Sequence, residues 1–135
     1  MIVVVSTHLD DAVFSCWDVL AGGGDVTVVT VFTGGPEPDM TSEWDRDTGV
    51  VSKVRMKQRI AENAAALALA GVAAVDLGCV EGQYGDGSVA PDALRPHLEE
   101  ADRVYVPAGV FLRGSNVEHL RARDVCLALR PDAVL

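Results

Sequence analysis

The stretch Ile2-Val3-Val4-Val5-Ser6-Thr7-His8-Leu9-Asp10-Asp11 decides the predicted fold, because a short apolar run bounded by turn residues is typical of a buried strand. Similar Val-rich runs recur at Val26–Phe32, Ala73–Leu77 and Arg103–Val106. Between Val26–Phe32 and Ala73–Leu77, the segment Ser52–Ala70 carries apolar residues at helical spacing. Strands that alternate with helices indicate a parallel sheet covered on both faces. We therefore expect a Rossmann-like α/β fold, a three-layer sandwich with a mostly parallel sheet.

Two further helices and two long loops complete the predicted architecture. We expect one helix over Asp10–Ala21, stopped by the three glycines that follow, and a last helix from Ser115 to about Leu129. The segments Thr33–Val51 and Gly78–Ala90 are longer than ordinary connections and follow strands. Ligands of α/β sheets bind outside the carboxyl ends of the strands, so these loops are expected to serve function.

Composition restricts the class of function. The formal net charge of −9 disfavours nucleic acid and anionic membranes as partners and favours a small or uncharged substrate. The three cysteines form no CxxC pair, which argues against a disulfide framework or a thiolate zinc site. The sequence shows no leader and no run of ~20 apolar residues, so we expect no membrane span and a cytoplasmic location.

The end of the chain resembles the opening of a fifth strand, at Asp132–Leu135. We therefore expect residues 1–135 to form one domain that is truncated at its C-terminus, with the rest of the fold absent. An unfinished sheet edge recruits other strands, which predicts self-association into a homo-oligomer or reduced stability.

A histidine and two carboxylates follow the first strand, where nucleotide-binding proteins place glycines. Neither a GxGxxG fingerprint nor a phosphate-binding loop is present. His8, Asp10 and Asp11 follow this strand, and His119 follows the fourth strand. In a sheet of order 3-2-1-4-5 these loops flank one crevice, so the four residues are expected to converge.

Two imidazoles and one carboxylate suit a catalytic Zn²⁺ with an open position. We take Asp11 as the third ligand beside His8 and His119, which leaves Asp10 free. The alternative is that Asp10 or Asp11 only caps the helix that follows. Glu118 fits a capping box with Ser115 and is interpreted as a helix-start residue, while the remaining histidine, His97, is interpreted as exposed and without a role.

These motifs make the chain resemble the LmbE-like, or PIG-L, family of zinc-dependent N-acetylglucosaminyl deacetylases. His8-Leu9-Asp10-Asp11 resembles the family's His-Pro-Asp-Asp motif, and Asn116-Val117-Glu118-His119 resembles its His-Pro-Asp-His motif. Arg59 and Glu62 match an Arg-x-x-Glu pair. The resemblance implies His8, Asp11 and His119 as metal ligands, Asp10 as general base and Arg59 as a substrate-binding residue. A salt bridge between Arg59 and Glu62 is the alternative for that pair.

The resemblance implies hydrolysis of an N-acetyl group on an amino sugar or an amino-sugar conjugate. Asn116 replaces a family histidine; it can donate a hydrogen bond to the substrate but cannot transfer a proton at neutral pH. Trp44 and Asp45 are candidates to contact the sugar from the first long loop, although a buried Trp44 that anchors the loop fits equally. The rival functions are a noncatalytic metal- or ligand-binding α/β module and a magnesium-dependent protein that binds phosphate or nucleotide; the two histidines disfavour magnesium.

Overall fold

The computed structural model describes residues 1–109 and 117–135. A parallel sheet of order β3-β2-β1-β4 lies at the centre of the described chain. It is formed by β1 (Ile2–Ser6), β2 (Val26–Thr30), β3 (Ala73–Asp76) and β4 (Arg103–Tyr105). In the register, β1 lies between β2 and β4, since Ile2 is the partner of both Val26 and Arg103. This order confirms the predicted switch point between the first and fourth strands.

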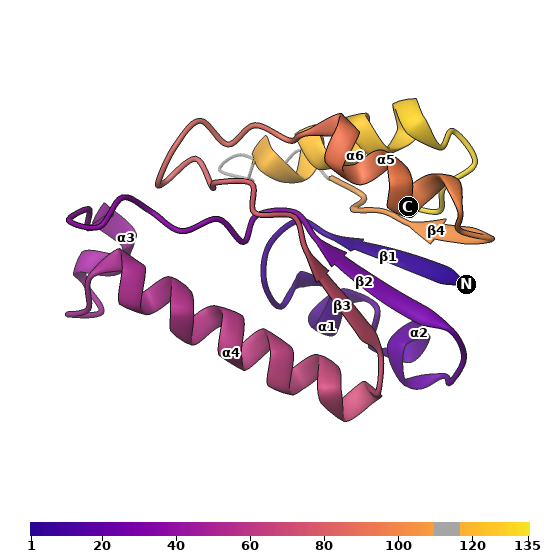
Figure 1. Cartoon of the computed structure of the whole chain (residues 1–135), viewed down its shortest axis with the longest axis horizontal. Coiled ribbons are helices and arrows are strands. Elements are labelled where there is room, and N and C mark those ends of the chain that lie inside the picture. Colours follow the sequence, from indigo (N-terminus) through magenta and orange to yellow (C-terminus); the bar gives the residue numbers. More distant parts are fainter. Residues whose placement is uncertain (110–116) are drawn as a thin grey trace.

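Helices cover both faces of the sheet (Figure 1). One face carries α1 (Asp11–Ser15), α2 (Trp17–Ala21) and α4 (Ser52–Ala70), and the other carries α5 (Pro91–Glu99) and α6 (Val117–Leu129). The short helix α3 (Glu43–Arg46) lies in the loop before α4. The three-layer α/β prediction is therefore confirmed.

Alternate residues of β1 enter two separate cores, which explains why its apolar run is continuous. Val3 and Val5 pack with Leu94 and Leu98 of α5, both of which are fully buried. Val4 packs on the opposite face with Leu20 of α2 and Leu67 of α4. A strand that is buried on both faces has apolar residues at successive positions, so it does not alternate between apolar and polar residues.

Several predicted boundaries differ from the structure. The helix expected over Asp10–Ala21 is two helices, because Cys16 leaves the helical region with φ −130° and ψ 23°. The second, third and fourth strands end one or two residues before their predicted ends. Helices α3 and α5 were not predicted, and α5 contains Pro96, a residue that usually ends a helix. His97 of α5 is half-buried, whereas it was expected to be exposed.

The segment expected to open a fifth strand lies beside β4, where it forms an isolated bridge. Val134 forms a parallel bridge with Tyr105, and its backbone exchanges hydrogen bonds with Val104 and Val106, each of 2.8 Å.

Among the described residues, no helix combines the length and the hydropathy that crossing a bilayer requires.

Candidate metal centre

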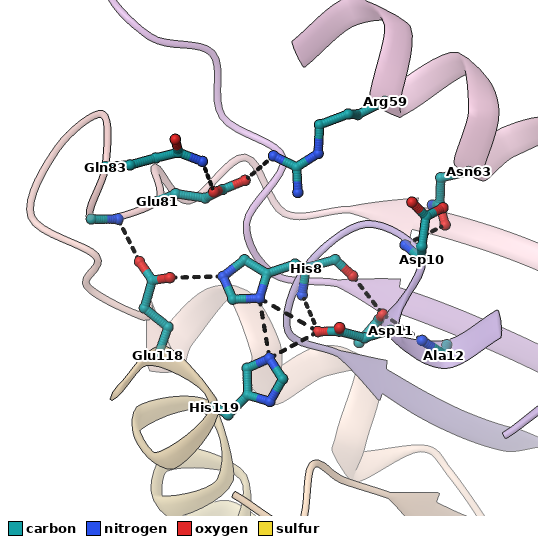
Figure 2. Close-up of polar contacts among 12 residues, drawn as sticks. His8, Asp10, Asp11, Ala12, Arg59, Asn63, Glu81, Gln83, Glu118 and His119 are labelled. Atoms are coloured by element: carbon teal, nitrogen blue, oxygen red, sulfur yellow. Dashed lines mark hydrogen bonds and ion pairs between the residues drawn. The ribbon is translucent and has the colours of Figure 1, made fainter. Parts of the chain in front are cut away.

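Three predicted ligands meet at the carboxyl end of β1 (Figure 2). His8 Nδ1 lies 3.2 Å from His119 Nε2 and 3.4 Å from Asp11 Oδ2, and the latter two atoms lie 3.1 Å apart. A tetrahedral zinc with ligand distances of about 2.0–2.1 Å separates its ligand atoms by roughly 3.4 Å. The three atoms therefore fit one face of a zinc coordination tetrahedron, and the set of His8, Asp11 and His119 fits a Zn²⁺ site.

The local backbone holds Asp11 in this position. Its Oδ2 accepts a hydrogen bond of 2.8 Å from the backbone N–H of His8. Burial alone raises the pKa of Asp11, but hydrogen bonds from His8 and the nearby charge of His119 outweigh this effect and lower the pKa below its ordinary value. Asp11 is therefore anionic at neutral pH.

His8 is buried between two acidic groups. Burial lowers the pKa of its imidazole, but hydrogen bonds with Asp11 and Glu118 outweigh burial and raise the pKa to about 9. Its ring also stacks on Phe32, with ring centroids 5.4 Å apart. The ring is thus fixed both by packing and by hydrogen bonds.

Asp10 takes a different direction from its neighbour. Its φ of 76° lies in the left-handed region, and no other non-glycine residue among those described has a positive φ. Its backbone N–H donates to Asn63 Oδ1 at 3.1 Å, and Figure 2 shows its carboxylate on the α4 side, away from the three ligands. Burial, together with the charges of Glu62 and Asp11, raises the pKa of Asp10 despite the opposing charge of Arg59.

A cavity of about 710 Å³ brings six of the predicted site residues together. Its lining includes His8, Asp11, Trp44, Asp45, Arg59 and His119, whereas Asp10 lies outside the lining. Asn116, and Ser115 of the expected capping box, lie outside the described residues.

The proposed substrate residues differ in how they are held. Arg59 Nη1 donates to Glu81 Oε1 at 2.8 Å, so its ion-pair partner is Glu81 rather than Glu62, the partner of the alternative interpretation. Trp44 is 79% exposed, which excludes the alternative of a buried anchor. Asp45 is buried and accepts a hydrogen bond of 2.5 Å from the Tyr84 hydroxyl.

The structure adds a residue that the sequence analysis assigned only to a helix start. Glu118 Oε2 lies 2.7 Å from His8 Nε2, the ring nitrogen that faces away from the ligand cluster. A carboxylate on the second nitrogen of a metal-binding histidine is a common feature of zinc sites. Glu118 is adjacent to His119, and this adjacency is the signal that could have found it.

Solved structures of deacetylases share this architecture. The A40926 pseudoaglycone deacetylase Dbv21 superposes with a TM-score of 0.79 and is 26% identical, over 97% of this chain and 59% of its own. The zinc-inhibited form of teicoplanin deacetylase Orf2 superposes with a TM-score of 0.78 and is 23% identical, over 97% and 63% of the two chains. This chain has the fold of these deacetylases. The predicted resemblance to a deacetylase family is thereby confirmed.

The same fold extends to a more distant protein, the conserved protein TT1542 from Thermus thermophilus. It has a TM-score of 0.62 and 19% identity, over 95% of this chain and 54% of its own. The chain thus spans between 54% and 63% of the length of these three solved structures. No family model and no curated protein sequence matches it.

Proposed function

We propose that this chain forms the metal-binding portion of a zinc-dependent hydrolase that removes an N-acetyl group from an amino sugar or an amino-sugar conjugate. The observation that carries the proposal is the convergence of one ligand atom each from His8, Asp11 and His119 at the carboxyl edge of the sheet. The likeness to the deacetylases Dbv21 and Orf2 supports the type of reaction. Two imidazole donors favour zinc over magnesium, which prefers oxygen ligands.

His8, Asp11 and His119 would hold the metal, which when bound supplies an activated water and polarises the acetyl carbonyl. Asp10 takes the proton of the attacking water and returns a proton to the leaving amine as the amide C–N bond breaks. The raised pKa of Asp10 suits this exchange. For this role its side chain has to turn from Asn63 towards the ligands. The products are acetate and a free amine.

The cavity beside the ligands would receive the sugar. Arg59, fixed by Glu81, would offer its remaining guanidinium N–H groups to hydroxyls, and the exposed Trp44 would offer an aromatic face to the apolar side of the ring. Asp45 lies in the same wall, but it is buried and its carboxylate accepts from the Tyr84 hydroxyl, so it would support the wall rather than bind a sugar hydroxyl. Asn116 stays a candidate hydrogen-bond donor to the substrate.

The test combines metal content with product release. Protein purified without a polyhistidine tag should contain about one zinc ion per chain by elemental analysis, and should release acetate from an N-acetylglucosamine conjugate. The His8→Ala, His119→Ala double variant should lose both. Metal retained by that variant would contradict the ligand assignment. Zinc binding without acetate release from any N-acetylated sugar would contradict the hydrolase and support a noncatalytic binding module.

A further inference from the structure

The Glu118 carboxylate joins two parts of the site that are distant in the sequence. Its Oε2 contacts His8 Nε2 at 2.7 Å, and its Oε1 accepts a hydrogen bond from the backbone N–H of Gly82 (Figure 2). The Glu118 side chain is only 10% exposed, so water competes little for these bonds. A single buried carboxylate therefore contacts both the metal centre and the loop that follows β3.

The contact with His8 determines which nitrogen is available to a metal. An ionised carboxylate only accepts hydrogen bonds, so His8 Nε2 carries the proton that points at Glu118. In the neutral ring, Nδ1 then presents its lone pair towards Asp11 and His119. Glu118 thus favours the tautomer and the ring orientation that bind a metal at Nδ1.

The loop of residues 78–90 is closely packed around the same carboxylate. A Cβ on Gly87 would lie 2.7 Å from Glu118 Oε1, and Gly87 also has a φ of +62°. One turn further along α6, Arg121 Nη1 donates to the backbone oxygens of Asp86 and Gly87, at 3.1 and 2.9 Å. The same loop carries Glu81, which holds Arg59 at the cavity.

We propose that Glu118 is a positioning residue that orients His8 for metal binding and fastens the loop of residues 78–90 to the metal centre. This inference rests on the zinc site of the proposed function. Because both oxygens of one carboxylate are engaged, order in the loop and affinity for the metal are coupled. A substitution at Gly87 that displaces the loop should therefore lower the affinity for the metal through Glu118, although Gly87 does not bind the metal itself.

The first experiment replaces the carboxylate by an amide. Glu118→Gln keeps the shape but presents one acceptor and one donor. If its oxygen accepts from Gly82, its amide N–H group can only donate to His8 Nε2, which moves the ring proton to Nδ1 and blocks the metal-binding nitrogen; if its oxygen accepts from His8, the bond to Gly82 is lost. Loss of such a partner typically lowers metal affinity about 10- to 100-fold, measured by competition with a chromophoric chelator. The matched control is Glu100→Gln, an exposed carboxylate at the end of α5, which should bind zinc like the wild type.

The second experiment approaches Glu118 from the loop. Gly87→Ala places a methyl group against Oε1 and should weaken zinc binding in the same direction, by a smaller factor. Gly23→Ala is its control, because Gly23 has a similar φ of +76° but no atom within 4 Å of the added Cβ. The control variant carries the backbone strain without the contact. It should therefore retain wild-type affinity for zinc.

The combined results decide the proposal. If the loop acts on the metal through Glu118, adding Gly87→Ala to Glu118→Gln should cause no further loss of zinc affinity. Zinc should also slow hydrogen exchange of the Gly82 amide in the wild type but not in Glu118→Gln. Wild-type zinc affinity in Glu118→Gln would overturn the proposal, as would equal affinities of Gly87→Ala and Gly23→Ala. If Glu118→Gln does not fold, the glycine pair still decides. Absence of acetate release would contradict the proposed hydrolase while leaving these affinity measurements valid.

Discussion

Asp10 and Asp11 are neighbours whose side chains leave the backbone in different directions, because Asp10 occupies the left-handed region at the start of α1. Asp11 is directed towards the two histidines, whereas Asp10 lies beside Asn63. The proposed metal ligand and the proposed proton acceptor can thus be neighbours in the sequence without competing for the same position. Their roles can be separated by amide substitutions, which preserve shape.

Asp10→Asn should keep its zinc and lose about 10²–10⁴ in turnover, the usual cost of removing a general base. Asp11→Asn should weaken zinc binding, and excess metal should partly restore its activity. Elemental analysis and acetate release measured on both variants make this comparison. Metal lost from Asp10→Asn and retained by Asp11→Asn would reverse the two assignments.

The pKa of His8, raised to about 9, predicts how metal binding depends on pH. In the metal-free chain the charged ring stabilises the fold fully below its ordinary pKa of 6.5, and this contribution is lost as the pH rises through about 9. Metal binding needs a neutral ring, so at pH 7.5 it should release about one proton from His8, and affinity should rise with pH.

Titration calorimetry in buffers of different ionisation enthalpy measures this release. His97→Ala, which changes a histidine on α5 outside the site, should release the same number of protons as the wild type. Metal binding without proton release would show that His8 is already neutral in the metal-free chain.

At the scale of elements, one buried hydrogen bond fastens α3 to the loop after β3. The Tyr84 hydroxyl donates to Asp45 Oδ2 at 2.5 Å, and both residues are buried. Ser42, the N-cap of α3, accepts from the Asp45 backbone N–H and donates to Gln83 of the same loop. These bonds hold together two walls of the cavity.

Tyr84→Phe removes the donor and leaves the buried Asp45 carboxylate with fewer partners. We expect a loss of about 1–3 kcal/mol in the free energy of unfolding, measured by denaturation in urea. Tyr105→Phe, at the end of β4, is the control and should unfold nearly as the wild type does. Equal stability of the two variants would contradict a structural role for the Tyr84 bond.

At the scale of the whole molecule, the site joins the two ends of the described chain. His8 follows β1 and His119 lies in α6, 111 residues later. A metal ion held by both should therefore stabilise the folded state as a whole.

Zinc at one hundred times its dissociation constant should stabilise the fold by about 2.7 kcal/mol, which raises the melting temperature by several degrees. Thermal unfolding of chelator-treated protein, with and without added zinc, measures this shift. His8→Ala should show no shift. The same melting temperature with and without zinc in the wild type would indicate that these residues do not form a tight site.

The sequence alone determined the layered fold and the residues that form the centre. The apolar runs specify strands, the periodic pattern of residues 52–70 specifies α4, and the rule for parallel sheets brings the loops after β1 and β4 together. These signals are local, or follow from general topology. They therefore sufficed to predict His8, Asp11 and His119 as one group.

Only the tertiary structure decided which side chains act on that group. Glu118 meets His8 across 110 residues, and Arg59 meets Glu81 across 22. The break at Cys16 and the left-handed backbone of Asp10 likewise appear only in the folded chain. Helical spacing favours the nearby pair of Arg59 and Glu62, but burial favours the partner that the folded chain places against the guanidinium. Contacts of this kind arise from the distances between packed elements, which local sequence patterns do not specify.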